Sequence, residues 1–340
     1  MTRRTWTLLV SLALAVALGL LGAFATVPYV ALRPGPTFDT LGTVAGKTVV
    51  DIKGTQTYPA TGHLNMTTVS VVDNVTLYTA LALWVSGRSE LLPRDEIYQP
   101  GLSEQQVETQ NRQMFRDSEA NAKAAALHYL GYPIDVVTGQ VVSGGASSGK
   151  LAVGDRLLAL DGHEVRTAQQ AVDLLAGSHP GQQVQVRFQR GDTSPQEATI
   201  TLGTGAQSGR GYLGVGLTEK PDVPFTVTIN LGDVGGPSAG LMFALAIVDK
   251  LAPGPLVRDT FVAGTGEITP EGQVGQIGGI SLKMISAREA GATVFLVPAG
   301  NCAEAVQRIP GGLRLVRVGT LADAVHALDQ LRDGHQPPHC

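Results

Sequence analysis

The longest apolar stretch of the chain is an uncharged run from Trp6 to Val27. A helix over this run would be about 33 Å long at ~1.5 Å per residue, enough to cross the ~30 Å hydrocarbon core of a bilayer. A signal peptide usually has an apolar region of only ~7–15 residues, so the pattern favours an uncleaved membrane anchor over residues 1–32, although Ala23-Phe24-Ala25 leaves cleavage open. Arg3 and Arg4 predict a cytoplasmic N-terminus and a single-pass protein of the cell membrane with the remainder extracytoplasmic.

The next segment, residues 33–130, alternates between strand and helix patterns. Gly62 to Val72 predict a strand, and Thr76 to Val85 predict a helix. Glu104 to Leu130 predict a long helix with one polar face, and Gly131 is typical of a helix C-terminus.

Residues 131–205 show a denser succession of strands and turns. Val136 to Val142 predict a strand, and Leu151 to Gly162 predict a turn, a strand and a second turn. A short helical pattern from Ala168 to Leu175 precedes two further strands. This order predicts a small β-rich module with one helix.

The pattern changes again around Gly235-Gly236-Pro237-Ser238-Ala239-Gly240. Phe225 to Leu231 predict a buried strand and Leu241 to Val248 a buried helix, so Ser238 stands at a strand-to-helix junction. The first amides of such a helix point toward Ser238 and could stabilise an oxyanion. Two interpretations stay open at this point, a serine nucleophile and a glycine-rich turn with a serine N-cap.

A serine hydroxyl needs a neighbouring base to act as a nucleophile. Lys283 stands where a loop enters a predicted helix that ends at Gly291, and its sequence neighbours are mostly apolar. Poor hydration lowers the pKa of a lysine and leaves a neutral amine that can take a proton from Ser238. From the spacing alone, an exposed lysine at the start of a helix is the simpler interpretation.

Three motifs in order resemble the proteolytic domain of the Lon protease family, namely Gly236 to Gly240, Gly264 to Thr269, and Gly278 to Lys283. Lys283 follows Ser238 by 45 positions, close to the family's usual interval. The resemblance covers residues 211–330. It implies an α+β fold class, with mixed sheets and helices in this domain, beside the transmembrane helix and the β-rich module.

The resemblance also implies the roles of the site residues. Ser238 would be the nucleophile and Lys283 the general base of a Ser-Lys dyad, a variant of the serine peptidase triad. The hydroxyl of Thr265 would help orient the amine. Gly235 and Gly236 would support the site, with backbone amides near Gly235 and Ser238 binding the oxyanion.

The chain departs from the family at one position of this site. Lon proteins commonly carry an aspartate three residues before the serine, where this chain has Gly235. Asp233 is two positions away, so an acidic contribution stays open. Lon domains also form rings and begin with a strand rich in threonine, which implies a homo-oligomer and a pairing of the strand from Gly62 with the later sheet.

No nucleotide is expected as a partner. Gly42 to Thr48 resembles a phosphate-binding P-loop, but only three residues separate its glycines where four are required, and no helix pattern follows. The chain is therefore predicted to be a Lon-type protease without the family's ATP-driven motor.

The middle module resembles a bacterial PDZ domain in the order of its elements and in the pair Gly154-Asp155 and Asp161-Gly162. Such a domain binds an extended peptide as an added strand. The resemblance places the groove between the first strand and the helix, with the lining residues Ile134, Ala168, Val172 and Leu175. The alternative is a spacer between anchor and protease.

Gly236 to Gly240 also fits the Gly-x-Ser-x-Gly elbow of α/β-hydrolases. That interpretation needs a later acid and histidine, for which Asp323, His326, Asp333 and His335 are available. The preceding chain lacks the alternating strands and helices of such a sheet, so this interpretation ranks below the Lon-like one.

Composition adds little to the picture. The net charge of −4 shows no basic excess, so no nucleic acid is expected. The histidines show no ligand pattern, and neither a metal nor another cofactor is predicted. Cys302 and Cys340 are the only cysteines of the sequence. We expect no essential disulfide and a disordered polar tail over residues 331–340.

Together these patterns predict a membrane-anchored, ATP-independent serine endopeptidase with a PDZ module at 131–205. Its partners would be protein or peptide substrates that are extracytoplasmic or membrane-associated. Two alternatives stay open, a catalytically inactive PDZ scaffold and, ranked lower, a serine esterase of the α/β-hydrolase type.

Overall fold

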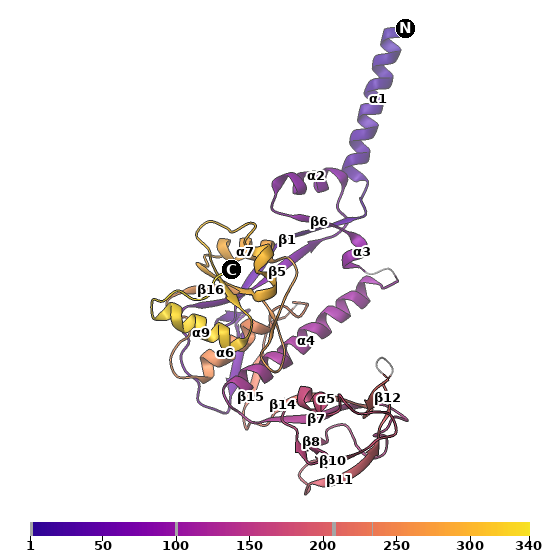
Figure 1. Cartoon of the computed structure of the whole chain (residues 1–340). Helices are drawn as coiled ribbons and strands as arrows, with labels where there is room; N and C mark the ends of the chain where they lie inside the picture. Colours follow the sequence, from indigo (N-terminus) through magenta and orange to yellow (C-terminus); the bar gives the residue numbers. More distant parts are fainter. Residues whose placement is uncertain (1–2, 99–100, 206–208, 233) are drawn as a thin grey trace.

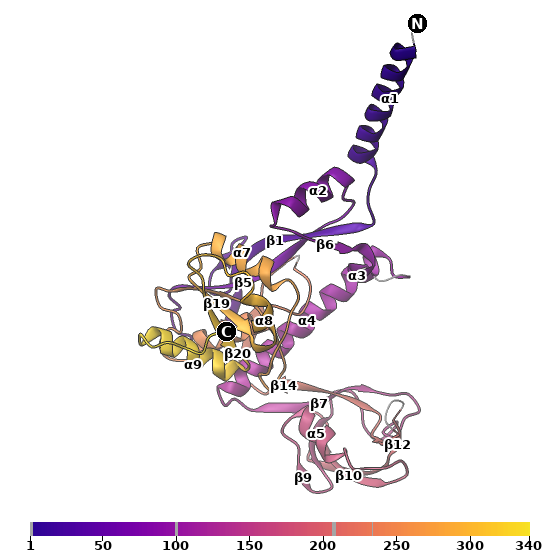
Figure 2. The ribbon, with the colours of Figure 1, turned by 45° about the horizontal axis from the view of Figure 1, so that its top comes forward.

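The computed structural model describes residues 3–98, 101–205, 209–232 and 234–340. A long helix projects from one end, a central body follows, and a smaller β-rich module lies at the far end (Figures 1 and 2). The longer helices are α1 (Arg3–Phe24), α2 (Leu77–Ser86), α4 (Glu104–Tyr129), α5 (Ala168–Leu174), α6 (Gly240–Leu251), α7 (Ile280–Glu289) and α9 (Leu321–Arg332), and the short ones are α3 (Arg94–Ile97) and α8 (Cys302–Ala305). The predicted α+β class is confirmed.

The central body is built on a six-stranded mixed sheet with the order β20-β19-β16-β5-β1-β6. These strands are β20 (Arg314–Val318), β19 (Val294–Pro298), β16 (Phe261–Gly264), β5 (His63–Val72), β1 (Tyr29–Asp39) and β6 (Glu90–Pro93). The four strands from β20 to β5 are parallel, β1 pairs antiparallel with β5, and β6 pairs antiparallel with β1. The pairing of β5 with β16 confirms that the strand from Gly62 joins the later sheet.

Helices cover both faces of this sheet. Successive residues of a strand point to opposite sides, so each strand contributes apolar side chains to both faces. Leu296 of β19 packs with α4, α6 and α9, whereas its neighbours Phe295 and Val297 pack with α7 and α8. Every residue of α6 except Lys250 is buried, as expected for a helix that is apolar on all sides. The predicted buried helix is therefore confirmed.

The helix α4 lies along α6 and begins with a capping box at Ser103 and Gln106. The rings of Phe115 and Phe243 meet edge to face at 5.8 Å between centroids, which packs the two helices together. The predictions for α4 and for α2 are confirmed within two residues at each end.

The β-rich module has a second sheet with the order β11-β10-β8-β7-β14, with β9 paired to β8. Its strands are β7 (Ile134–Val141), β8 (Arg156–Leu160), β9 (His163–Glu164), β10 (Gln183–Gln189), β11 (Gln196–Thr201) and β14 (Val215–Pro221). The module extends beyond its expected limits of 131–205 and takes in the start of the range 211–330, because β14 pairs with β7 along its whole length. Since β5 and β16 share the other sheet, the module is inserted between two parts of the central body.

The remaining strands form two-stranded pairs. They are β4 (Val50–Lys53) with β15 (Thr226–Ile229), β2 (Thr43–Val44) with β3 (Lys47–Thr48), β17 (Glu267–Ile268) with β18 (Val274–Gly275), and β12 (Gly203–Thr204) with β13 (Gly211–Tyr212). The prediction of a buried strand before the serine is wrong in one respect, because β15 buries only one face: Thr226 and Thr228 are exposed, whereas Ile229 is buried. Among the described strands β15 pairs with β4 alone. The segment Gly42 to Thr48 folds into the β2–β3 hairpin and so lacks the helix that follows a P-loop.

The C-terminal tail differs from the expected disordered end. Cys302 and Cys340 form a disulfide, Pro337 is buried, and Arg317 donates its backbone amide to the carbonyl of Pro338 at 3.0 Å. The tail therefore lies against β20, and the polar composition of residues 331–340 did not reveal this packing.

Replacing both cysteines by serine should lower the free energy of unfolding by about 2–4 kcal/mol, because the disulfide closes a loop of 38 residues. Thermal unfolding followed by near-ultraviolet circular dichroism measures this change. An unchanged unfolding temperature in the double variant would show that the bridge adds no stability.

Candidate active site

Ser238 lies in the loop between β15 and α6, and two hydrogen bonds from adjacent residues fix its position. Its carbonyl accepts the Gly266 amide at 2.9 Å and the Thr265 hydroxyl at 3.0 Å. Thr265 and Gly266 follow the carboxyl end of β16, so the central sheet positions the serine. The loop also rests on α4, whose Ser118 hydroxyl donates to the carbonyl of Pro237 at 2.8 Å.

The two glycines before the serine allow this close contact with α4. Gly236 has a φ of +86°, a conformation that L side chains rarely adopt, and its amide donates to the carbonyl of Asn111 at 3.0 Å. A Cβ atom at Gly235 would lie 3.0 Å from that of Asn111. A side chain at position 235, where Lon proteins commonly have aspartate, would therefore crowd α4. Asp233 lies outside the described residues.

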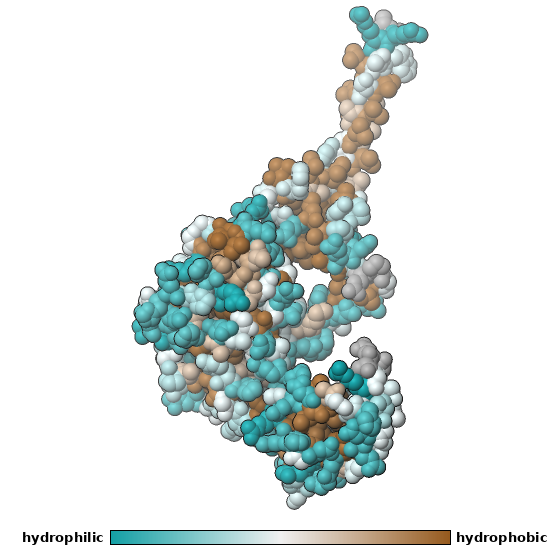
Figure 3. Space-filling view, in the orientation of Figure 1, coloured by the Kyte–Doolittle hydropathy of each residue, from teal (hydrophilic) through white to brown (hydrophobic). Residues whose placement is uncertain are grey.

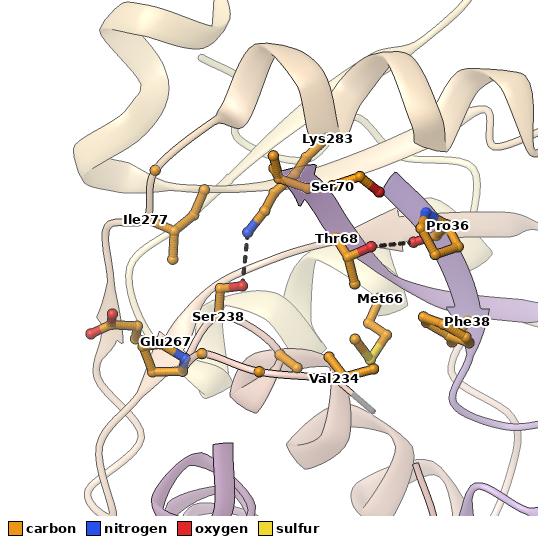
Figure 4. A pocket seen from close by; sticks show the side chains of 16 residues that line it. Pro36, Phe38, Met66, Thr68, Ser70, Val234, Ser238, Glu267, Ile277 and Lys283 are labelled. Atoms are coloured by element: carbon orange, nitrogen blue, oxygen red, sulfur yellow. Dashed lines mark hydrogen bonds between the residues drawn. The ribbon is translucent and has the colours of Figure 1, made fainter. Parts of the chain in front are cut away.

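Lys283 occupies the first turn of α7, on the other face of the central sheet from α6. Its neighbours Ile280, Leu282 and Met284 are buried with it, and its own side chain is 3% exposed. Lys283 Nζ lies 2.8 Å from Ser238 Oγ and 3.0 Å from Thr265 Oγ1, and donates to both in the structure. Figure 4 shows the amine reaching down to the serine hydroxyl.

Burial lowers the pKa of Lys283 to about 8, and the nearby Glu267 carboxylate opposes part of this shift. The low-dielectric surroundings disfavour the ammonium form, as the sequence pattern predicted. A neutral amine is therefore accessible near neutral pH, and it could accept a proton from a hydroxyl at hydrogen-bond distance. The structure thus brings Ser238, Lys283 and Thr265 together.

Ser238 and Lys283 border an open cleft of about 440 Å³, and Thr265 is buried behind them. One wall comes from β1 and β5 through Pro36, Phe38, Met66 and Thr68, and the other comes from the loop around Gly235 and from Glu267 (Figure 4). The amides of Gly235 and Ser238 are donated to no other group among the described residues. An oxyanion formed beside Ser238 would therefore find unpaired donors there.

The pKa of Lys283 predicts how activity should depend on pH. If the neutral amine acts as the base, kcat/KM should rise roughly tenfold between pH 7 and 9 and level off above a midpoint near 8, because protonated amine cannot accept a proton. Initial rates of peptide hydrolysis across this range measure the profile. A flat profile would contradict the assignment of the base.

Glu267 provides the matched variant for this profile. The substitution Glu267→Gln removes the charge that favours the ammonium form, so the midpoint should move to lower pH. A midpoint that stays in place would mean that another group titrates. Glu267 lies within the motif from Gly264 to Thr269, and no role for it was predicted.

The α/β-hydrolase interpretation is not supported by the geometry. The Asp323 carboxylate caps α9 by accepting the amides of Gly319 and Thr320 at 3.1 and 2.9 Å. His326 is exposed on the same helix and lies 3.1 Å from the Gln330 amide. Neither residue lines the cleft that holds Ser238.

A second groove of about 490 Å³ lies in the β-rich module between α5 and β14. It is lined by Ala168, Val172 and Leu175, as predicted, and on the strand side by Leu213, Val215 and Leu217. The prediction of Ile134 is wrong, because this residue lies in β7, pairs with Pro221 and packs against the core of the central body. The β14 strand, not β7, forms the edge of the sheet beside the helix.

The start of α5 is tied to β14 by a buried carboxylate. Glu219 accepts the Ala168 amide at 2.7 Å, and burial raises the pKa of this glutamate. The bond sets the separation between helix and strand. Pro270 and Glu271, from the turn between β17 and β18, close one side of the groove, so it adjoins the central body.

Two family models match this chain. Residues 227–329 match the Lon protease (S16) C-terminal proteolytic domain, and residues 106–202 match the PDZ domain. The first match contains Ser238 and Lys283. The second begins within α4 and ends before β14, so its limits differ from those of the module's sheet.

Similar curated proteins are Lon proteases. Lon protease 2 of Herpetosiphon aurantiacus is 34% identical over 128 residues, which are 37% of this chain and 15% of that protein. Lon protease 3 of Sorangium cellulosum is 30% identical over 171 residues, which are 43% of this chain and 20% of that protein. The chain thus spans at most a fifth of the length of these two relatives. It carries a Lon-type proteolytic domain and a PDZ domain.

A solved PDZ domain, from an SdrC-like protein of Listeria monocytogenes, is 23% identical and covers 24% of this chain and 86% of that structure, with a TM-score of 0.23.

Proposed function

We propose that this protein is a membrane-anchored serine endopeptidase that works without ATP through a Ser238–Lys283 dyad. The observation that carries the proposal is the 2.8 Å separation of Lys283 Nζ and Ser238 Oγ at the edge of an open cleft. The match of residues 227–329 to the Lon proteolytic domain supports it.

In the proposed reaction the neutral amine of Lys283 takes the hydroxyl proton of Ser238 while Oγ bonds to the substrate carbonyl carbon. The carbonyl oxygen becomes an oxyanion that the amides of Gly235 and Ser238 stabilise. The ammonium then gives its proton to the leaving nitrogen, the peptide C–N bond breaks, and an acyl-enzyme ester remains on Ser238. Water, deprotonated by the same amine, hydrolyses this ester. Thr265 holds the amine in place.

The anchor in this proposal is α1, an apolar helix of 22 residues. Of its most apolar stretch of 18 residues, only 6% is buried against the rest of the protein. Its length suits a bilayer, and Arg3 and Arg4 favour a cytoplasmic N-terminus. The disulfide of Cys302 and Cys340 is consistent with an oxidising compartment for the catalytic part. A reporter fused after Cys340 should therefore behave as extracytoplasmic.

The open cleft and the missing P-loop point to substrates that are unfolded or flexible. The test is digestion by the purified full chain in detergent, without nucleotide, of casein and of a stably folded protein. Casein should be cleaved and the folded protein should resist. Efficient digestion of the folded protein, or no digestion of either, would contradict the proposal. Inactivity toward all peptides would favour the alternative of a PDZ scaffold.

We propose further that the groove between α5 and β14 binds substrate segments as an added strand. Val172 is 58% exposed on α5 and lines the groove, so Val172→Glu should raise KM for casein by about tenfold, since a charge there opposes apolar contact. Val153→Glu alters an exposed valine outside the groove and is the matched control. Hydrolysis of a short peptide should be unchanged in both. Equal KM values for the two variants would show that the groove does not bind the substrate.

A further inference from the structure

The helix α2 exposes apolar side chains on the face that it does not pack against the protein. Its sequence from Leu77 to Ser86 has no charged residue. Ala80 packs inward on Ala31 and Val75, which satisfies one side. The outward side chains are exposed to an unusual degree, with values of 49% for Leu77, 50% for Tyr78, 56% for Leu81, 69% for Trp84 and 74% for Val85.

A helix that is apolar on all sides is normally covered on all sides. Contiguous exposed apolar surface of this kind marks a site for a protein or a membrane. In Figure 3 the apolar surface over α2 adjoins that of α1 at the foot of the long helix. The two helices therefore share one apolar surface, and its continuity with the proposed span favours lipid as the covering phase.

The connection between α1 and α2 is short and fixed by hydrogen bonds. Thr26 forms a β-bridge with Thr76, and the Val27 amide donates to the Val75 carbonyl at 2.9 Å. Gly22 in the last turn of α1 lies against the ring of Tyr78, where a Cβ would be 2.7 Å from the ring. The helix α2 is thus held at the level where the apolar run of α1 ends, which is the membrane–water interface if α1 spans the bilayer.

The orientation of α2 agrees with a position at the membrane–water interface. Both ribbon views show α2 lying across the foot of α1 rather than along it (Figures 1 and 2). A helix across a spanning helix lies roughly in the membrane plane. Tyr29, Tyr78 and Trp84 add amphipathic rings of the kind enriched at membrane interfaces.

We infer that α2 is an interfacial helix that inserts its Leu77, Leu81, Trp84 and Val85 side chains among the lipids of the outer leaflet. The inference rests on the proposed anchoring by α1. It gives the protein a second contact with the membrane and fixes the orientation of the central body. The strand β1 begins at Tyr29 beside α2 and reaches the cleft at Pro36, about 23 Å away at ~3.3 Å per residue. The cleft would be held at about this distance from the bilayer, within reach of extended segments of membrane proteins.

The sequence has two tryptophans, Trp6 in α1 and Trp84 in α2, so single substitutions isolate each fluorophore. The full chain carrying Trp6→Phe reports on α2, and the full chain carrying Trp84→Phe reports on α1. Both are reconstituted into phosphatidylcholine vesicles whose acyl chains carry bromine near the glycerol end, with unbrominated vesicles as reference. Iodide added outside measures exposure to water.

We expect bromine to quench most of the emission of both tryptophans and iodide to quench little of that of Trp84. Quenching of Trp6 alone, with Trp84 open to iodide, would place α2 in water and overturn the inference while leaving the anchor intact. Quenching of Trp6 alone, with Trp84 shielded from iodide, would mean that protein, such as a second copy of the chain, covers α2, and would also overturn it. Absence of bromine quenching from both would contradict the anchor itself.

Discussion

Ser238→Ala should abolish peptide hydrolysis, with a loss of kcat on the order of 10⁴-fold or more. The hydroxyl is the atom that bonds to the substrate carbonyl, and alanine offers no replacement. The fold should be retained because the two bonds that fix position 238 use its carbonyl and not its side chain. Initial rates on a fluorogenic peptide measure the loss, and circular dichroism checks the fold.

The matched control for this variant is Ser281→Ala, which removes a serine hydroxyl two residues from Lys283 and outside the cleft lining. Its activity should equal that of the natural protein. If Ser238→Ala kept more than a small fraction of the activity, the nucleophile would have to be another group, and the proposed dyad would be wrong.

Lys283→Met should lower kcat by about 10²–10⁴-fold, the contribution typical of a general base, because methionine fills the space without accepting a proton. The control is Lys250→Met, which changes another lysine whose pKa burial lowers but whose amine donates to the Val50 carbonyl at 2.6 Å. That variant should keep its activity. Equal losses in the two variants would indicate a structural effect of removing a partly desolvated lysine side chain.

The same Lys283→Met variant should be more stable than the natural protein. The difference between a pKa of 10.5 in the unfolded chain and about 8 in the folded one corresponds to about 3 kcal/mol. The unfolded chain binds more protons between these two values, so the free energy of unfolding of the natural protein should rise from pH 8 to 10.5. The variant should lack this rise and unfold at a higher temperature at pH 7. A gain in stability with a loss of activity is expected of a residue kept for function.

Much of the central site could be predicted because three motifs, by their order and spacing, resemble the Lon proteolytic domain, and that resemblance implied the roles of Ser238, Lys283 and Thr265. Lys283 was placed among apolar neighbours by sequence, and the structure buries it there. The part that α4 plays was missed. Asn111 and Ser118 hold the loop of the nucleophile through contacts across more than a hundred residues, and nothing in a helical pattern reveals such a partner.

The PDZ groove was only half predicted for a similar reason. The resemblance to a PDZ domain placed the helix side of the groove on α5, where the structure has it, but placed the strand side on the first strand of the module. The strand that lies beside α5 is β14, the last strand of the module in sequence order, and it falls within the range 211–330 that was assigned to the proteolytic domain. Strand order within a sheet depends on long-range pairing, which alternation of residues does not encode.

The half-exposed β15 and the ordered tail show two further limits of prediction from the sequence. A β-branched run predicts a strand but not how many strands pair with it, and among the described strands β15 pairs with β4 alone. The tail is polar in composition, yet Cys340 bonds to Cys302 and fastens it to the body. Pairing of two distant cysteines could not be read from their spacing.

The most direct test of the proposed chemistry is to identify the residue that carries the acyl group. The full chain is mixed with a peptide p-nitrophenyl ester at pH 8, quenched in acid after a short time, and mapped by tandem mass spectrometry. The dyad predicts an acyl adduct on Ser238 that decays as the ester hydrolyses and that forms far more slowly in Lys283→Met. An adduct on a different residue, or turnover of the ester with Ser238 never acylated, would contradict it.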